Sequence, residues 1–230
     1  MKLRELLLFF TPGFDATPLV EKFRSGAAVT AGVLLLGWAV HMLFPDTGYF
    51  GLSLLSSMAA AALLVYALPH SPMAQPWPLI VGNLVSGVVG VACAILIPDT
   101  LWAAAGATGL SVFVMHLTRS LHPPGAATAL FMALNASAFQ HHGWAWSAGV
   151  VLANILLTLL LAIIINNLIH LGRYPVRRHQ APAKTEVVSA SLTEEDVEWA
   201  LRQMEGVTDV SEEDLLEIFR LACLHAKNKK

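Results

Sequence analysis

The sequence predicts an all-α fold: a polytopic helical membrane protein with about six membrane-crossing or re-entrant helices and a short cytoplasmic helical tail. Of its 230 residues 56% are hydrophobic and only 13% are charged, against roughly 25% charged in a typical soluble domain. Between Ser25 and His170 the charged residues are Asp46, Asp99 and Arg119 alone. Because lipid offers backbone groups no hydrogen-bond partners, long apolar segments must form helices.

The apolar segments follow one another with turn-forming residues between them. Residues 1–24 combine a basic start with an apolar run, and we expect them to form an amphipathic helix on the membrane surface. Five later runs reach the roughly 20 residues that a crossing needs: 25–44, 49–68, 78–97, 101–118 and 144–169. A sixth run, 123–138, would span roughly 24 Å at about 1.5 Å per residue, a little less than the hydrocarbon core.

Basic residues flank the apolar region at both of its ends in the chain. Lys22 and Arg24 precede the first run, and Arg173, Arg177 and Arg178 follow the last. Since cytoplasmic segments are enriched in such residues, both termini are predicted to be cytoplasmic, in the inner membrane of a bacterium. Termini on one side require an even number of crossings, so either 123–138 crosses as the sixth helix or one of the other five runs does not cross; we expect six crossings.

The domain boundaries follow from a change of composition near the C-terminus. The predicted transmembrane domain, 25–172, is followed by a linker, 173–190, and an acidic helical hairpin, 191–230. Residues 181–230 contain eleven acidic and six basic residues. Two N-capping residues, Thr193 and Ser211, each precede an acidic first turn. A hairpin of this size buries little surface alone, so we expect it to dock on the membrane domain or on a second copy of the chain.

The most unusual stretch of the apolar region is RSLHPPGAATAL, at residues 119–130. Two consecutive prolines, Pro123 and Pro124, are well tolerated in the first turn of a helix, so the helix is predicted to begin there. Its first amides, those of Gly125 and Ala126, would then lack intrahelical partners and carry the positive end of the helix dipole. This arrangement favours an anion.

Three polar side chains precede that helix start. We expect Arg119 to provide the charge partner of an anion, Ser120 a hydrogen-bond donor together with the amides of Gly125 and Ala126, and His122 a donor or a proton-linked switch. The structural alternatives are that Arg119 only anchors its helix by reaching the headgroups and that His122 is a turn residue.

Secondary candidates lie on neighbouring runs. Gln75 and the following proline precede the 78–97 run much as His122 precedes the 123–138 run, so two helix starts could meet at one site. Asn83 and Thr128 either line a polar path or bond to adjacent helices. Small residues recur every four positions and predict close helix packing: Gly125, Ala129, Ala133 and Ser137.

Several kinds of chemistry have no support in the sequence. The histidines have no spacing that would gather metal ligands, and paired carboxylates, a nucleophile triad and a phosphate-binding loop are not found. The two cysteines offer no disulfide framework. We therefore expect no enzyme, no cofactor, no metal site and no nucleic-acid partner.

Two segments carry a family resemblance. SPMAQPWPLIVGNLVSGVVGV at 71–91 and SLHPPGAATAL at 120–130 resemble the HPP family of integral membrane proteins, over roughly 20–175. The family is generally described with four transmembrane segments, and some members are implicated in nitrite transport. In many bacterial members an acidic helical connector leads to a pair of CBS domains. Residues 192–222 resemble that connector, but no CBS pair follows before Lys230, so we do not expect adenine-nucleotide regulation.

Together these features predict membrane transport of a small monovalent inorganic anion, with nitrite as the leading candidate. The expected partners are that anion, the lipid bilayer and a second copy of the chain. One alternative is a non-transporting signalling or scaffold module that recruits a cytosolic partner through its acidic C-terminal helices. Another is a membrane enzyme that uses His122 and Arg119 on an anionic substrate.

Overall fold

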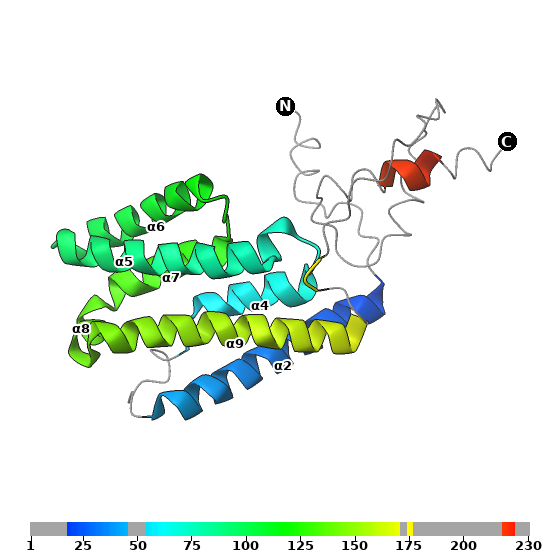
Figure 1. The fold of residues 1–230 in the computed structure, drawn as a ribbon, viewed down its shortest axis with the longest axis horizontal. Coiled ribbons are helices and arrows are strands. Elements are labelled where there is room, and N and C mark those ends of the chain that lie inside the picture. The colour runs from blue at the N-terminus through cyan, green and yellow to red at the C-terminus, as the bar shows by residue number, and fades with distance from the viewer. Residues whose placement is uncertain (1–17, 46–53, 171–173, 177–217, 224–230) are drawn as a thin grey trace, which may run out of the picture.

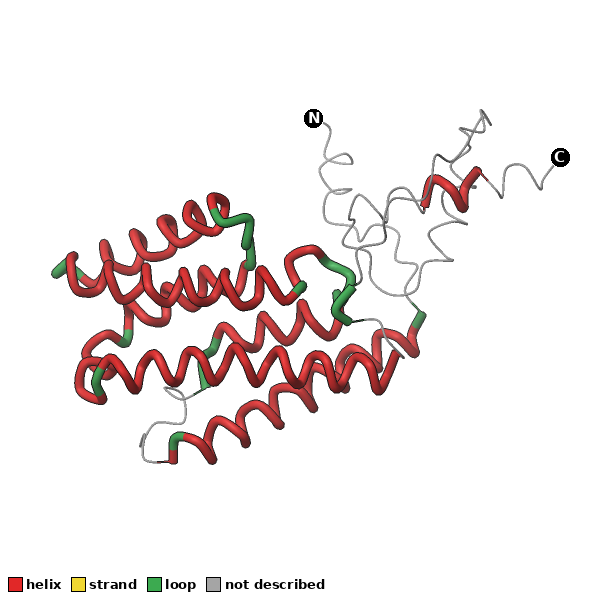
Figure 2. Tube along the Cα trace, in the orientation of Figure 1, coloured by secondary structure: helices red, strands yellow, loops and turns green. Residues whose placement is uncertain are grey.

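A computed structural model describes residues 18–45, 54–170, 174–176 and 218–223. Every regular element in these ranges is helical (Figures 1 and 2). Most of the predicted surface helix at 1–24 lies outside the described residues, and so does most of the linker and C-terminal hairpin. Of the hairpin, 218–223 is described and is helical, as predicted.

The described elements confirm an all-α, polytopic membrane protein. They are α2 (Leu19–Leu43), α4 (Ser57–Ala67), the short turns η2 (Pro72–Ala74) and η3 (Pro78–Gly82), α5 (Asn83–Leu96), α6 (Thr100–Leu117), α7 (Pro123–Leu134), α8 (Ala136–His142) and α9 (Trp144–His170). Four segments are long and apolar enough to cross a membrane: Leu19–Leu43, Pro78–Leu96, Thr100–Leu117 and Ala145–Leu168. Two apolar helices, α4 and α7, are shorter. Helix α4 has 11 residues, so the described part of the 49–68 run does not form the full crossing that we predicted.

The 123–138 run does not form the single crossing helix that we predicted. Helix α7 ends at Leu134, and α8 begins after Asn135. The Asn135 side chain donates to the carbonyl of Phe131 at 2.9 Å, and the Asn135 backbone amide donates to the same carbonyl at 3.1 Å. At about 1.5 Å per residue α7 is roughly 18 Å long, well short of a hydrocarbon core of about 30 Å.

The helices form two groups that pack side by side. One group contains α5, α6 and α7, which contact one another extensively, and the other contains α2, α4 and α9 (Figure 1). Helix α4 also contacts α7, which joins the groups. Buried aliphatic residues such as Leu36, Val65 and Ile155 fill the core of the second group. Large apolar side chains such as Trp38 and Trp102 are exposed on the outside, as expected of surfaces that face lipid.

Close packing in the first group depends on small residues, as the spacing in α7 predicted. Ala129 and Ala133 are buried with Cys93 of α5. A Cβ atom at Gly90 of α5 would lie only 2.6 Å from the carbonyl oxygen of Ala129, so the two backbones approach as only a glycine allows. Ser137 falls in α8 and is exposed, so it does not share this contact.

Candidate functional site at the start of α7

The start of α7, the start of α5 and the end of α6 meet at one place, which we call the junction: Gly82, Ser86, Met115, Ser120, His122 and Gly125. A Cβ atom at Gly82 would lie 2.7 Å from the Ser120 carbonyl oxygen and 2.8 Å from the His122 Cβ. A Cβ atom at Gly125 would lie 2.9 Å from the Ser86 hydroxyl oxygen. The two helix starts therefore do lie together, and glycines permit the contact.

The connector at 118–122 begins with a Schellman-type end of α6. The Ser120 amide donates to the Met115 carbonyl at 2.9 Å, and the Arg119 amide donates to the His116 carbonyl at 3.2 Å. Arg119 occupies the left-handed position of this motif, with φ of 51°, where glycine is usual. The turn points Ser120 into the protein, where it is buried, and leaves Arg119 exposed.

The backbone at Arg119 leads to a prediction about stability. A residue with a Cβ loses roughly 1–2 kcal/mol in the left-handed conformation relative to glycine, so Arg119→Gly should be about 1 kcal/mol more stable than Arg119→Ala. Both variants remove the same charge, which makes alanine the matched control. Thermal unfolding of the two variants in one detergent measures the difference. Equal stability would show that the left-handed turn does not constrain this position.

His122 is fully buried and has one of its two ring nitrogens bonded. Nδ1 lies 2.8 Å from the Met73 carbonyl oxygen. Because a carbonyl can only accept, Nδ1 carries the hydrogen, and in the neutral ring Nε2 is then a lone-pair acceptor. His122 belongs to the connector, outside the four long apolar segments. Burial lowers the pKa of its imidazole to about 4, and the bond to Met73 opposes this shift, so the ring is neutral at neutral pH.

Two buried polar atoms at the junction have no hydrogen-bond partner among the described residues. They are Nε2 of His122 and the hydroxyl oxygen of Ser86. Buried polar groups in folded proteins are nearly always paired, and each exception calls for an explanation such as a bound water, ion or substrate. Ser86 was not among the predicted site residues. Its only signal in the sequence is its position three residues after Asn83, among glycines.

At the start of α7, the bonding of the Gly125 amide differs from what the sequence predicted. The Gly125 amide donates to the His122 carbonyl at 2.7 Å, so the prediction that it is left free is wrong. The physical reason is a tightened first turn, a common way for helix ends to satisfy backbone groups. Ala126 is half-buried at the next position.

The remaining residues of the motif divide between surface and interior. Pro123 is exposed, whereas Pro124 is buried. The Ser120 hydroxyl lies 2.7 Å from the hydroxyl of Thr118. Pro123 and Pro124 occupy the first turn of α7, where the sequence placed them. Both lack an amide hydrogen, so they donate nothing to a ligand.

Both polar atoms of the Gln75 side chain form hydrogen bonds, and these bonds join two segments of the chain. Its amide nitrogen donates to the carbonyls of Pro69 and Ser71, both at 2.9 Å, and its side-chain oxygen accepts from the Val176 amide at 3.0 Å. The Tyr174 hydroxyl donates to the Ala74 carbonyl at 2.7 Å. We call this contact between 174–176 and 74–75 the clasp. It adjoins the Met73 carbonyl, which orients His122.

Asn83 and Thr128 bond to neighbouring helices, one of the two roles that the sequence left open for them. The Thr128 hydroxyl oxygen lies 2.7 Å from the Asn83 side-chain oxygen and 2.8 Å from the Ser57 hydroxyl oxygen. The Asn83 amide nitrogen donates to the Leu79 carbonyl at 2.8 Å, so its oxygen only accepts. Thr128 must donate to Asn83 and accept from Ser57. All three are buried and join α4, α5 and α7.

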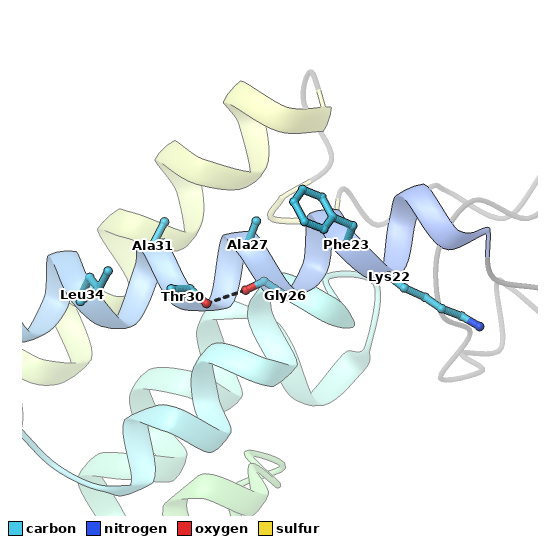
Figure 3. Close-up of a pocket in the computed structure, with 7 residues that line it drawn as sticks. All are labelled: Lys22, Phe23, Gly26, Ala27, Thr30, Ala31 and Leu34. Atoms are coloured by element: carbon cyan, nitrogen blue, oxygen red, sulfur yellow. Dashed lines mark hydrogen bonds between the residues drawn. The ribbon is translucent and has the colours of Figure 1, made fainter.

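Two surface hollows lie away from the junction. An open one follows exposed residues of α2, from Lys22 to Leu34, and a side-chain hydrogen bond among the lining residues joins Thr30 to the Gly26 carbonyl (Figure 3). It lies on an outward face of a candidate span. A smaller hollow of about 240 Å³ lies at the other end of α5, and its polar lining residues are Thr100, Ser137 and Gln140. In the described parts of the chain, no group of three metal-binding side chains is present.

The helices and their lengths define an integral membrane protein. Residues 15–175 match the family described as "HPP, transmembrane region", and the chain belongs to this family. A transmembrane protein of Dictyostelium discoideum is 40% identical over 127 residues, which cover 54% of this chain and 40% of that protein. A second Dictyostelium discoideum transmembrane protein is 36% identical over 127 residues, or 54% of this chain and 44% of the relative. The chain thus spans less than half the length of either. No solved structure is significantly similar to it.

Proposed function

We propose that this protein carries a small monovalent inorganic anion across a membrane, with nitrite as the leading candidate, and that the anion binds at the junction. The observation that supports this most directly is the pair of buried atoms without partners, Ser86 Oγ and His122 Nε2. Leaving such groups unpaired costs free energy. A ligand that bonds to both would remove that cost.

The surroundings of these two atoms suit a small ligand of negative charge. The Ser86 hydroxyl is directed at the first turn of α7, since it would lie 2.9 Å from a Cβ at Gly125. That turn carries the positive end of the helix dipole. Arg119 is exposed at the same end of α6 and adds a positive charge on the surface beside the junction. Glycines at 82 and 125 bring the helix starts into close contact around these two atoms.

Membership of the HPP transmembrane family is compatible with transport, and the nitrite assignment rests on the resemblance of the motifs to members implicated in nitrite movement. We place both termini and the junction on the cytoplasmic side, because basic residues flank the apolar region at both chain ends. A bacterial inner membrane is the location that we propose. In this proposal the protein performs no enzymatic reaction and uses no cofactor.

The test is uptake into liposomes by two matched serine variants. Ser86 and Ser111 are both fully buried, but Ser111 donates to the Thr108 carbonyl at 2.8 Å. Ser86→Ala removes no existing bond, so it should leave thermal stability unchanged and lower nitrite uptake. Ser111→Ala should lose about 0.5–1.5 kcal/mol of stability and retain uptake. Nitrate, formate, bicarbonate and chloride are measured alongside.

Saturable nitrite uptake by the parent protein, reduced in Ser86→Ala alone, would support both the transport function and its site. Uptake that is equal in Ser86→Ala and the parent would remove the junction from the proposal. The absence of flux for every anion tested, with protein shown to be folded, would contradict the transport function.

A further inference from the structure

The side chains at the junction offer too few donors for a bare anion. Pro123 and Pro124 have no amide hydrogen, and the Gly125 amide is already bonded to the His122 carbonyl, which leaves Ala126 as the first residue of α7 whose amide could donate. Of the two atoms without partners, only the Ser86 hydroxyl carries a hydrogen. His122 Nε2 presents a lone pair, because the hydrogen of the neutral ring is held on Nδ1 by the Met73 carbonyl. A lone pair repels an anionic oxygen.

That conflict disappears when one proton accompanies the anion. The proton can lie on the anion's oxygen, which then donates to Nε2, or on Nε2, which then donates to the oxygen. In either form an N···H···O contact replaces two opposed lone pairs, and the buried site gains no net charge. Neutrality matters because an unpaired buried charge is strongly unfavourable.

We infer that the junction takes up its anion together with a proton, an inference that rests on the proposed function. The transported unit is then neutral overall, and His122 Nε2 is the atom that accepts the proton. The reaction is a proton transfer only: an O–H or N–H bond forms from a proton of the aqueous phase, and no electrons are exchanged. Met73 is the positioning residue, since its carbonyl fixes which nitrogen is free.

Few other groups near His122 could accept the proton instead. The turns η2 and η3 and the first turns of α5 and α7 contain no titratable side chain. At the end of α6, His116 and Arg119 are exposed. Tyr174, on the other side of η2, uses its hydroxyl to donate to Ala74, and His70 is half-buried in the turn before η2. His122 is the buried titratable group of the junction itself.

The first experiment measures charge and protons in liposomes that contain the parent protein. A potassium gradient with valinomycin sets the membrane potential, and an internal pH dye reports proton entry during nitrite uptake. Protein-free liposomes provide the rate at which the neutral acid leaks. We expect protein-dependent nitrite entry to be matched by equal proton entry and to be insensitive to an imposed potential.

Two substitutions at His122 test the roles of its two ring nitrogens separately. In His122→Asn the side-chain amide can still donate to the Met73 carbonyl, but the acceptor at the Nε2 position is lost. Nitrite uptake should then fall roughly tenfold to a hundredfold, because that is the effect of losing a hydrogen bond to a charged group. In His122→Gln a permanent donor replaces the acceptor. Any nitrite flux that remains there should follow the membrane potential and bring no protons.

A second readout does not depend on transport. In spectra of protein labelled with ¹⁵N-histidine, the signals lost in His122→Asn identify the ring, and addition of nitrite should shift Nε2 more than Nδ1. Nitrite uptake that follows the potential without proton entry would overturn this inference and leave the transport function standing. A lack of flux for every anion would instead contradict the proposed function, and an Nε2 signal that shows a hydrogen before nitrite is added would contradict the assigned tautomer.

Discussion

Gly90→Ala is expected to destabilise the protein strongly. The new Cβ would lie 2.6 Å from the Ala129 carbonyl oxygen and 2.8 Å from the Met132 Cβ, distances that force α5 and α7 apart. Overpacking of this kind typically costs about 1–3 kcal/mol and occasionally more. Because backbone atoms cannot move aside as a flexible side chain can, we expect a value at the upper end of that range.

Gly109→Ala is the matched control for this prediction. Gly109 lies in α6, is exposed, and would place a Cβ with no other atom within 4 Å. Alanine is favoured over glycine in a helix by roughly 0.5–1 kcal/mol, so this variant should be slightly more stable than the parent. Thermal unfolding followed by size-exclusion chromatography in detergent compares the two. If Gly90→Ala were as stable as Gly109→Ala, the close approach of α5 and α7 would be contradicted.

Thr128→Val is expected to have the next largest effect on stability. Valine has nearly the same shape, so the packing is kept, but the Asn83 oxygen loses its donor and the Ser57 hydroxyl loses its acceptor. Each buried polar group left without a partner costs roughly 1–3 kcal/mol. The loss should therefore exceed that of a single hydrogen bond. Chemical denaturation in mixed micelles, followed by tryptophan fluorescence, measures it.

Thr108→Val supplies the comparison. The Thr108 hydroxyl donates only to the Ala104 carbonyl of its own helix, at 2.8 Å, so its removal leaves no second side chain unpaired. We expect a loss of about 1 kcal/mol or less. The Ser57→Ala, Thr128→Val double variant should lose less than the sum of the single variants, because the two hydroxyls share one bond. Additive losses would show that they do not interact.

The fold class could be predicted from the sequence because its signal is spread over many residues. Long apolar runs with three charges among them allow little except helices in lipid. The break at Asn135 could not be predicted, since hydropathy continues through it, and the same side-chain bond to the carbonyl four residues back occurs at Asn154 within the unbroken helix α9. Asparagine within an apolar run is also compatible with an unbroken helix, so the residue alone is ambiguous.

The candidate site was predicted in part. The His-Pro-Pro motif placed the helix start, but the roles of individual residues depended on contacts between distant segments. Gln75 and Asn83 look alike in the sequence as polar residues near a helix start, and the side-chain oxygen of each accepts from a distant segment, from Val176 and Thr128 respectively. Ser86 and Met73 carried no distinctive signal, although one is unpaired and the other orients His122. Such assignments require knowledge of which carbonyl meets which nitrogen.

The clasp connects residues 174–176, which follow α9, to the imidazole of His122. The backbone of Val176 is tied to Gln75, Tyr174 is tied to Ala74, and the next carbonyl along, that of Met73, holds Nδ1 of His122. A displacement of the backbone at Val176 would therefore be transmitted through residues 73–75 to the imidazole ring of His122. If these residues moved, the ring would lose the bond that fixes its tautomer, and either nitrogen could then carry the hydrogen.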